Sequence, residues 1–210
     1  CIGCVSEERK DDINRYLKFK GIPLSQINYV NGTYLEDIDK FDYGYFKMSP
    51  SEAKLTDPNQ RLLLETAFHA IEDAGYAGER IKGSNTGVFI GYSINIRDLY
   101  SRIIYDIDPS MIPISLVGNT TAVLPGRISY MLNLKGPSMV VDTACSSSLV
   151  AVDVACQSLR NGTCDMAIAG GIKLSIMPVT LKNELMNIGF EASDGRTRAF
   201  DDESDGTGLG

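Results

Sequence analysis

The pattern of apolar and polar positions is clearest between residues 138 and 169. An apolar run at residues 138–141 predicts a strand, and a helical pattern covers residues 145–160. Asn161-Gly162 ends that helix, and a second apolar run follows at residues 166–169. Strand, helix and strand within about 33 residues is the spacing of a right-handed crossover between parallel strands, so we expect a parallel, buried sheet.

The helix expected at residues 145–160 is apolar on nearly every face. One stripe at helical spacing and the positions flanking it hold apolar side chains: Cys145, Leu149, Val152, Cys156 and Leu159, then Val150, Ala151, Val154 and Ala155. A helix that is apolar all round belongs in the interior, so we expect it to pack between the layers of a larger protein. Cys156 is then a small core residue, and Cys164 in the following turn has no visible partner.

A second helix is expected at residues 57–75. Asp57 can cap its free N–H groups, Pro58 suits the first helical position, and Gly75 ends it. One face is predicted to hold the apolar positions: Leu62, Leu63, Thr66, Ala67, Ala70, Ile71 and Ala74. His69 falls on the opposite face, between Glu65 and Asp73, so we expect a solvated histidine paired with a carboxylate.

The remaining segments give weaker patterns. Residues 1–50 are polar and mixed, which predicts mostly irregular structure with short helices. Residues 87–91 are predicted to be a buried strand and residues 99–105 a helix, followed by proline-containing connections at Asp108-Pro109 and Ile112-Pro113. A helical pattern at residues 118–134 contains Pro125-Gly126, which should kink or split it.

Composition and charge exclude several classes of protein. The chain has 210 residues and a net charge of −7, without a Lys/Arg block, so nucleic-acid binding is a poor expectation. Neither a membrane-spanning apolar run nor a secretory signal is visible, and we expect a cytoplasmic protein. The five cysteines have no framework spacing, and the Cys1/Cys4 pair lacks further ligands for a metal. We therefore expect no metal site at these cysteines.

Cys145 stands at the junction between the expected strand and helix, in the run DTACSSS. At the start of a helix, free backbone N–H groups and the helix dipole favour an anion, which lowers the pKa of a thiol. The same N–H groups can bind the oxyanion that forms when a thioester is attacked. Ala144 and Ser146 are as small as a strand-to-helix elbow requires. On these residues alone, Cys145 is either a nucleophile or a small buried residue.

Further motifs along the chain resemble one family. The run VDTACSSSLVAV at residues 141–152 is similar to the active-site signature of β-ketoacyl synthases, in particular the ketosynthase domains of modular type I polyketide synthases. Other matching stretches occur in the family's order: DPNQRLLLE at 57–65, EDAGY at 72–76, GRISY at 126–130, KGPS at 135–138, ACQSLR at 155–160, AGG at 169–171 and FD at 200–201. The ending DGTGLG at 205–210 resembles ketosynthases of synthases with separate acyltransferases (trans-acyltransferase type).

The resemblance implies an α/β fold of the layered thiolase type, with a mostly parallel buried sheet and a central helix that carries the nucleophile. Cys145 would take an acyl chain from the phosphopantetheine arm of an acyl carrier protein, and its backbone N–H would be an oxyanion donor. A malonyl-type extender would then lose carbon dioxide and attack the thioester to give a β-ketoacyl product, as in antibiotic biosynthesis. The resemblance implies no bound metal or redox cofactor, because the substrates arrive on the phosphopantetheine of carrier proteins, and it implies a homodimer.

The sequence departs from the family in one half. The family's two catalytic histidines belong to motifs resembling HGTGT and NxGH, and neither motif occurs in residues 1–210. His69 cannot replace them, because it lies in the helix at residues 57–75. We therefore interpret residues 1–210 as the N-terminal part of a single ketosynthase domain, without the family's first strand and its C-terminal half.

Several alternatives remain open at this point. The C-terminal half would complete the active site, or the chain acts alone with no complete catalytic site and at most accepts an acyl group on Cys145. Some ketosynthases only transfer acyl chains without elongating them. A cysteine hydrolase would need a base beside Cys145. A scaffold module would have no use for a thiol at a helix N-terminus.

Overall fold

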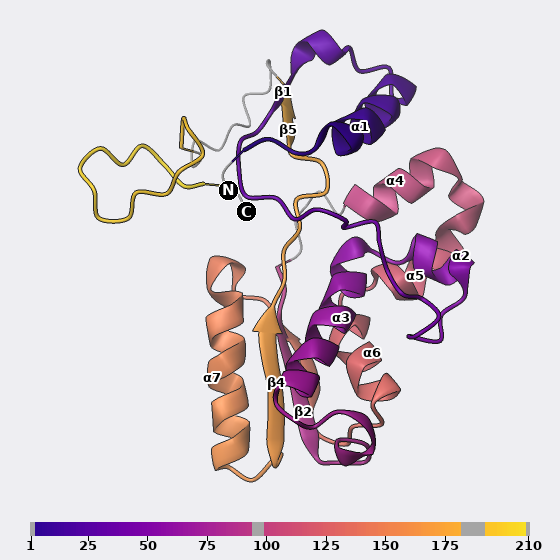
Figure 1. Cartoon of the computed structure of the whole chain (residues 1–210), viewed down its shortest axis with the longest axis vertical. Helices are drawn as coiled ribbons and strands as arrows, with labels where there is room; N and C mark the ends of the chain where they lie inside the picture. Colours follow the sequence, from indigo (N-terminus) through magenta and orange to yellow (C-terminus); the bar gives the residue numbers. More distant parts are fainter. Residues whose placement is uncertain (1–2, 94–98, 182–191, 209–210) are drawn as a thin grey trace. The chain divides into compact units, whose positions relative to one another are not determined.

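The computed structural model describes residues 3–93, 99–181 and 192–208, which belong to two units (Figure 1). One unit comprises residues 38–174 and the other residues 1–37 with 175–210. The helices of the larger unit are α2 (Pro50–Leu55), α3 (Pro58–Asp73), α4 (Leu99–Ile107), α5 (Ile112–Asn119), α6 (Val123–Met131) and α7 (Ser147–Arg160). Its strands are β2 (Thr86–Gly91), β3 (Ser138–Val141) and β4 (Met166–Gly171).

A three-stranded parallel sheet organises the larger unit, in the order β3-β2-β4. The central strand β2 is buried along its whole length, as its unbroken apolar sequence predicts. Its side chains alternate between the two faces: Phe89 packs with Ala151 and Ala155 of α7, whereas Val88 and Ile90 join the larger core with α3 and α6. The sheet therefore lies between α7 on one face and α3 and α6 on the other (Figure 1).

The crossover predicted from residues 138–169 is confirmed. β3 leads into α7, and α7 leads back to β4, which lies parallel to β3 with β2 between them. Strand β3 runs from Ser138 to Val141 as predicted, and β4 extends two residues further than predicted, to Gly171. Between β3 and α7 the chain forms a short 3-10 turn, Ala144–Ser146.

Helix α3 begins as predicted and buries a different face from the one predicted. The Asp57 carboxylate accepts a hydrogen bond from Asn59 N at 2.7 Å, which caps the helix. Leu63, Ala67 and Ile71 are buried, together with Leu64. The prediction for Thr66, Ala70 and Ala74 is wrong, because all three are exposed. The start of the helix is buried all round, so the inward face is rotated toward Leu64.

Two predictions that depended on proline are also wrong in detail. Helix α6 contains Pro125 and Gly126, and the break in the pattern at residues 118–134 instead comes at Thr120 to Ala122. Pro125 lies in the first turn of α6, where an N–H group has no intrahelical acceptor and its absence costs little. For the same reason Ile112-Pro113 opens α5 rather than forming a connection.

The smaller unit contains α1 (Glu7–Phe19), β1 (Ile27–Tyr29) and β5 (Val179–Leu181). The prediction of mostly irregular structure in residues 1–50 is therefore wrong for α1, a 13-residue helix that Ser6 caps and that buries Ile13 and Leu17. β1 and β5 pair antiparallel. The Arg9 guanidinium donates to the carbonyl oxygens of Ser175 and Ile176, which ties α1 to the chain before β5.

Candidate active site

Cys145 lies in the 3-10 turn between β3 and α7, at the carboxyl edge of the parallel sheet. The prediction that Cys145 lies in the first turn of the helix is wrong by two residues, since α7 begins at Ser147. The side chain is exposed, so the described residues do not bury it as a small core residue. In open α/β sheets this edge is where ligands bind.

Two glycines at the ends of neighbouring strands bring α7 close to this edge. A Cβ atom on Gly91, the last residue of β2, would lie 2.5 Å from Ser148 N and 2.6 Å from Ser147 C. A Cβ atom on Gly171, at the end of β4, would lie 2.7 Å from Ser148 Cβ. The first turn of α7 therefore contacts the carboxyl ends of both strands directly. This contact determines the distance between the sheet and the turn that holds Cys145.

The turn itself contains a strained residue. Ala144 has a φ of 55°, in the left-handed region that costs an alanine about 1–2 kcal/mol. Such a conformation persists only where the surroundings fix it. Ala144 N donates to Asp142 Oδ1 at 3.1 Å, and Ser146 Oγ donates to Thr143 O at 2.8 Å. The sharp turn that small neighbours predicted is thus present and is held by side chains of its own run.

Ser147 links both sides of the turn. Its hydroxyl accepts from Thr143 N at 2.9 Å and donates to Ala144 O at 2.6 Å. Within the described part of the chain, the backbone N–H of Cys145 donates to no protein acceptor. A free N–H beside an exposed thiol is the pair of groups needed to attack a carbonyl and to bind the resulting oxyanion.

The other cysteines and the histidine lie in different surroundings. The prediction that Cys156 is a core residue is wrong, because it is half-buried on α7 and outside the core clusters. Cys164 is buried beside Phe89 and Ala155. Cys4 is exposed, and Cys1 lies outside the described residues. His69 is exposed as predicted, but its partner is Glu72, at 3.4 Å, rather than Glu65 or Asp73.

A buried polar cluster at the start of α3 did not emerge from the sequence patterns. Burial raises the pKa of Asp57, and this outweighs the hydrogen bonds that the carboxylate accepts from Asn59. Asn59 Oδ1 accepts from Leu174 N at 2.8 Å, just beyond β4. Burial also raises the pKa of Tyr100, whose hydroxyl donates to Lys54 O. The signal for this cluster is the polar run at residues 57–61 directly before the apolar run at residues 62–64.

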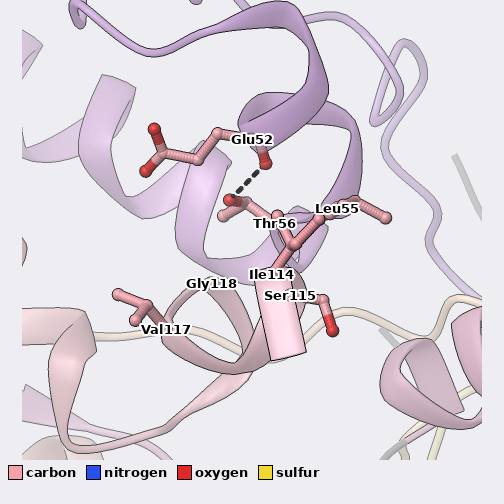
Figure 2. A pocket seen from close by; sticks show the side chains of 7 residues that line it. All are labelled: Glu52, Leu55, Thr56, Ile114, Ser115, Val117 and Gly118. Atoms are coloured by element: carbon pink, nitrogen blue, oxygen red, sulfur yellow. Dashed lines mark hydrogen bonds between the residues drawn. The ribbon is translucent and has the colours of Figure 1, made fainter. Parts of the chain in front are cut away.

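A pocket of about 280 Å³ lies between α2 and α5 (Figure 2). Its lining is mostly apolar and consists of Glu52, Leu55, Thr56, Ile114, Ser115, Val117 and Gly118. Thr56 Oγ1 donates to Glu52 O at 2.9 Å, and the Glu52 carboxylate pairs with Arg127 at 2.8 Å. The polar groups of the pocket are therefore occupied by structural contacts, and Cys145 does not line it.

Neither a metal centre nor a membrane span occurs among the residues that the structure describes. No cluster of three or more His, Cys, Asp or Glu side chains there could hold a metal ion. In the same part of the chain, every helix is too short or too polar to cross a membrane.

Comparison with known proteins identifies the family. The family model described as "Beta-ketoacyl synthase, N-terminal domain" matches residues 1–210. The chain belongs to the β-ketoacyl synthase family. The resemblance of the DTACSSS run and its companion motifs is thereby confirmed over the whole chain.

Relatives of this ketosynthase chain are polyketide synthases. Polyketide synthase PksN of Bacillus subtilis (strain 168) is 39% identical over 210 residues, which is 99% of this chain and 4% of that protein. Highly reducing polyketide synthase dmxL2 of Cryptosporiopsis sp. is 44% identical over 177 residues, or 83% of this chain and 7% of that protein. Their names do not state whether the acyltransferase is separate, so that subtype stays a prediction.

Solved ketosynthase structures share the fold. The ketosynthase from module 6 of the bacillaene synthase of Bacillus subtilis 168 superimposes with a TM-score of 0.72 at 33% identity, covering 98% of this chain and 32% of that one. The predicted thiolase-like α/β fold with a parallel sheet is thereby confirmed. The chain spans about a third of the length of such a ketosynthase and a smaller share of the synthases.

Proposed function

We propose that Cys145 is the acyl-accepting nucleophile of a polyketide ketosynthase. The observation that carries this proposal is the exposed thiol in a strained turn at the carboxyl edge of the sheet, within a chain that matches the family over its whole length. Cys156, half-buried within α7, and buried Cys164 lack that setting. The N–H of Cys145 would be an oxyanion donor, as expected from its free position in the turn.

The proposed step is a thioester exchange. The Cys145 thiolate attacks the carbonyl carbon of an acyl group carried on the phosphopantetheine arm of an acyl carrier protein. The oxyanion of the tetrahedral intermediate accepts a hydrogen bond from the Cys145 N–H. The carbon–sulfur bond of the carrier thioester then breaks, and the phosphopantetheine sulfur leaves as a thiolate, which takes up from solvent the proton that the Cys145 thiol had released. The acyl chain remains on Sγ of Cys145, where a malonyl-type extender can attack it after losing carbon dioxide.

We assign decarboxylation to the remainder of the ketosynthase. The only histidine of the chain, His69, is exposed on α3 and paired with Glu72. Residues 1–210 match the N-terminal domain of the family. The family's two histidines would come from the C-terminal half of the ketosynthase. Residues 1–210 are accordingly the N-terminal part of one ketosynthase domain, and by themselves they hold the acyl group without completing the carbon–carbon bond.

Two surfaces support the proposed partners. The outer face of α7 exposes Leu149, Val152 and Leu159, at 76%, 44% and 41%, which suits coverage by the C-terminal half of the same domain. Among the described strands of this sheet, β3 and β4 each pair on one side only, and a free strand edge of this kind suits the homodimer expected from the family. The acyl carrier protein delivers both substrates.

The test uses the intact ketosynthase, an acyl-thioester of N-acetylcysteamine and mass spectrometry of the labelled peptides. We expect acylation at Cys145, loss of that label in Cys145→Ala, and full labelling in the matched variant Cys156→Ala. If Cys156 or Cys4 is acylated as fast as Cys145, Cys145 is not the acyl-accepting residue.

Elongation is tested separately from acylation. With malonyl carrier protein, an elongating ketosynthase that is loaded at Cys145 releases carbon dioxide, forms a β-ketoacyl product on the carrier protein and frees the Cys145 thiol. A ketosynthase that only transfers acyl chains, the alternative function, is acylated at Cys145 without releasing carbon dioxide. His69→Gln should leave both reactions unchanged, whereas a cysteine hydrolase that used His69 as its base would lose activity.

A further inference from the structure

The hydroxyl of Ser147 is buried beside Cys145 and makes two hydrogen bonds to the backbone of the turn. Ser147 is 5% exposed, although it belongs to a run of three serines at the surface of the turn. Its hydroxyl accepts from Thr143 N at 2.9 Å and donates to Ala144 O at 2.6 Å. The backbone N–H of Ser147 donates to the same Ala144 oxygen. Both hydrogen-bonding roles of the hydroxyl are therefore used within the turn.

These bonds determine the orientation of one peptide group. Ala144 O and Cys145 N–H belong to the same planar peptide, in which the C=O and N–H bonds point in opposite directions. Two donors on Ser147 hold Ala144 O toward the start of α7. The Cys145 N–H must then point away from α7, out of the turn, where it meets no protein acceptor among the described residues.

The conformation of Ala144 makes this restraint necessary. A φ of 55° turns the Ala144–Cys145 peptide into an orientation that an alanine does not prefer. Without the Ser147 hydroxyl, Ala144 O would keep only the backbone donor, and Thr143 N–H would lose its acceptor. The peptide would then be free to rotate toward an ordinary conformation, and the direction of the Cys145 N–H would change with it.

We infer that Ser147 is a positioning residue for acyl transfer, which fixes the Cys145 N–H in the direction of the oxyanion. The inference rests on the proposed function of Cys145. Ser147 does not touch the acyl group. It acts through the Ala144–Cys145 peptide, so its loss affects reactions that pass through an oxyanion and spares reactions of the thiol that do not.

The experiment compares two reactions of Cys145 in the intact ketosynthase. Acylation by an N-acetylcysteamine thioester passes through a tetrahedral oxyanion, whereas alkylation by iodoacetamide displaces iodide without one. In Ser147→Ala we expect acylation to slow by about 100-fold, the effect that displacement of a catalytic group by about 1 Å can have. Alkylation of Cys145 should stay at the wild-type rate. Ser147→Thr, which retains the hydroxyl, should restore acylation.

Ser148→Ala is the matched control, because it removes an exposed serine hydroxyl one residue further along α7. It should leave both rates unchanged. Buried Cys164 reports on unfolding, since iodoacetamide reaches it only when the core opens. The inference is overturned if Ser147→Ala slows acylation no more than Ser148→Ala, or if it slows acylation and alkylation equally, whether or not Cys164 becomes reactive. A wild-type enzyme that is not acylated at Cys145 would instead refute the proposed function.

Discussion

At the scale of single residues, small side chains shape the turn around Cys145, the proposed nucleophile. The DTACSSS run places hydroxyls and one carboxylate within hydrogen-bond distance of the peptides beside the thiol. Their short side chains can bond to neighbouring backbone groups, which is why such residues favour turns over regular helix. Ala144 is strained directly beside the exposed thiol, and the hydrogen bonds within the run offset that strain.

Substitution of Ala144 tests that strain. Ala144 is exposed, so a larger side chain there loses no core packing. Ala144→Val should lower the free energy of unfolding by about 1–2 kcal/mol, because a β-branched residue disfavours the left-handed region. Ala144→Gly, which adopts that region freely, should not lower it. Urea unfolding of both variants measures the effect, and equal stability of the two would show that φ at this position is unimportant.

The buried carboxyl of Asp57 gives a prediction for pH dependence. Burial raises the pKa of Asp57 in the folded chain, so the folded state binds a proton more tightly than the unfolded state. The free energy of unfolding should therefore fall as pH rises from the unfolded pKa through the folded pKa, and level off above it. Asp57→Asn removes this component and retains a residue that caps helices equally well.

Chemical unfolding of wild type and Asp57→Asn at several pH values tests this. The stability of wild type relative to the variant should be greatest in acid and should decline as pH rises. A relative stability that increases with pH would show that the hydrogen bonds from Asn59, not burial, dominate at this carboxyl.

At the scale of elements, the position of α7 depends on glycines that end two strands. A Cβ atom on Gly91 would collide with the backbone of Ser147 and Ser148, and such backbone atoms cannot move without moving the helix. Parallel strands buried on both faces leave no space to absorb that shift. The contact between β2 and α7 therefore links the sheet to the site.

Gly91→Ala should both destabilise the protein, by about 1–3 kcal/mol, and slow acylation of Cys145, because the start of α7 must move. Gly136→Ala is the matched control. A Cβ atom there would lie 2.5 Å from Thr86 C, at the opposite end of β2. It should destabilise to a similar extent without changing the acylation rate corrected for folded protein. If both variants slow acylation equally, the contact at Gly91 does not position the thiol.

At the scale of the whole molecule, α7 has one covered face and one open face. The sheet covers Ala151 and Ala155, and Leu149 is 76% exposed on the other side. The expectation that α7 packs between layers is therefore only half met within this chain: one layer is the sheet, and the second layer is absent from the described residues. The apolar sequence of the helix is explained if the C-terminal half of the ketosynthase supplies that layer.

A charge at Leu149 tests this explanation in the intact ketosynthase. If the C-terminal half covers the helix, Leu149→Asp should lower the free energy of unfolding by roughly 3 kcal/mol, since it buries an unpaired charge. Gln157→Lys, which adds a charge at an exposed polar position of α7 and keeps a donor for Asp153, should have little effect. Denaturant unfolding of both variants provides the measurement. If Leu149→Asp leaves the free energy of unfolding unchanged, this face of α7 stays in solvent.

Helix patterns were most misleading where proline or a buried helix start intervened. Pro125 was expected to break a helix, and it lies in the first turn of α6, where its missing N–H is not needed. The inward face of α3 was placed around Ala70 and Thr66, because the pattern cannot show that residues 58–61 are buried whatever their polarity. Helix α1 was missed because only Ile13 and Leu17 face inward in a strongly charged segment.

The sequence alone determined the crossover at residues 138–169, the parallel sheet, the family and the candidate nucleophile, because each depends on local order: periodicity, turn residues and a short motif. Only the tertiary structure decided that Cys145 precedes α7, that Ala144 is left-handed and that Ser147 holds the adjoining peptide. These features depend on how closely the strand ends approach the helix. Such distances follow from packing among Gly91, Gly171 and Ser148, residues that are far apart in the chain.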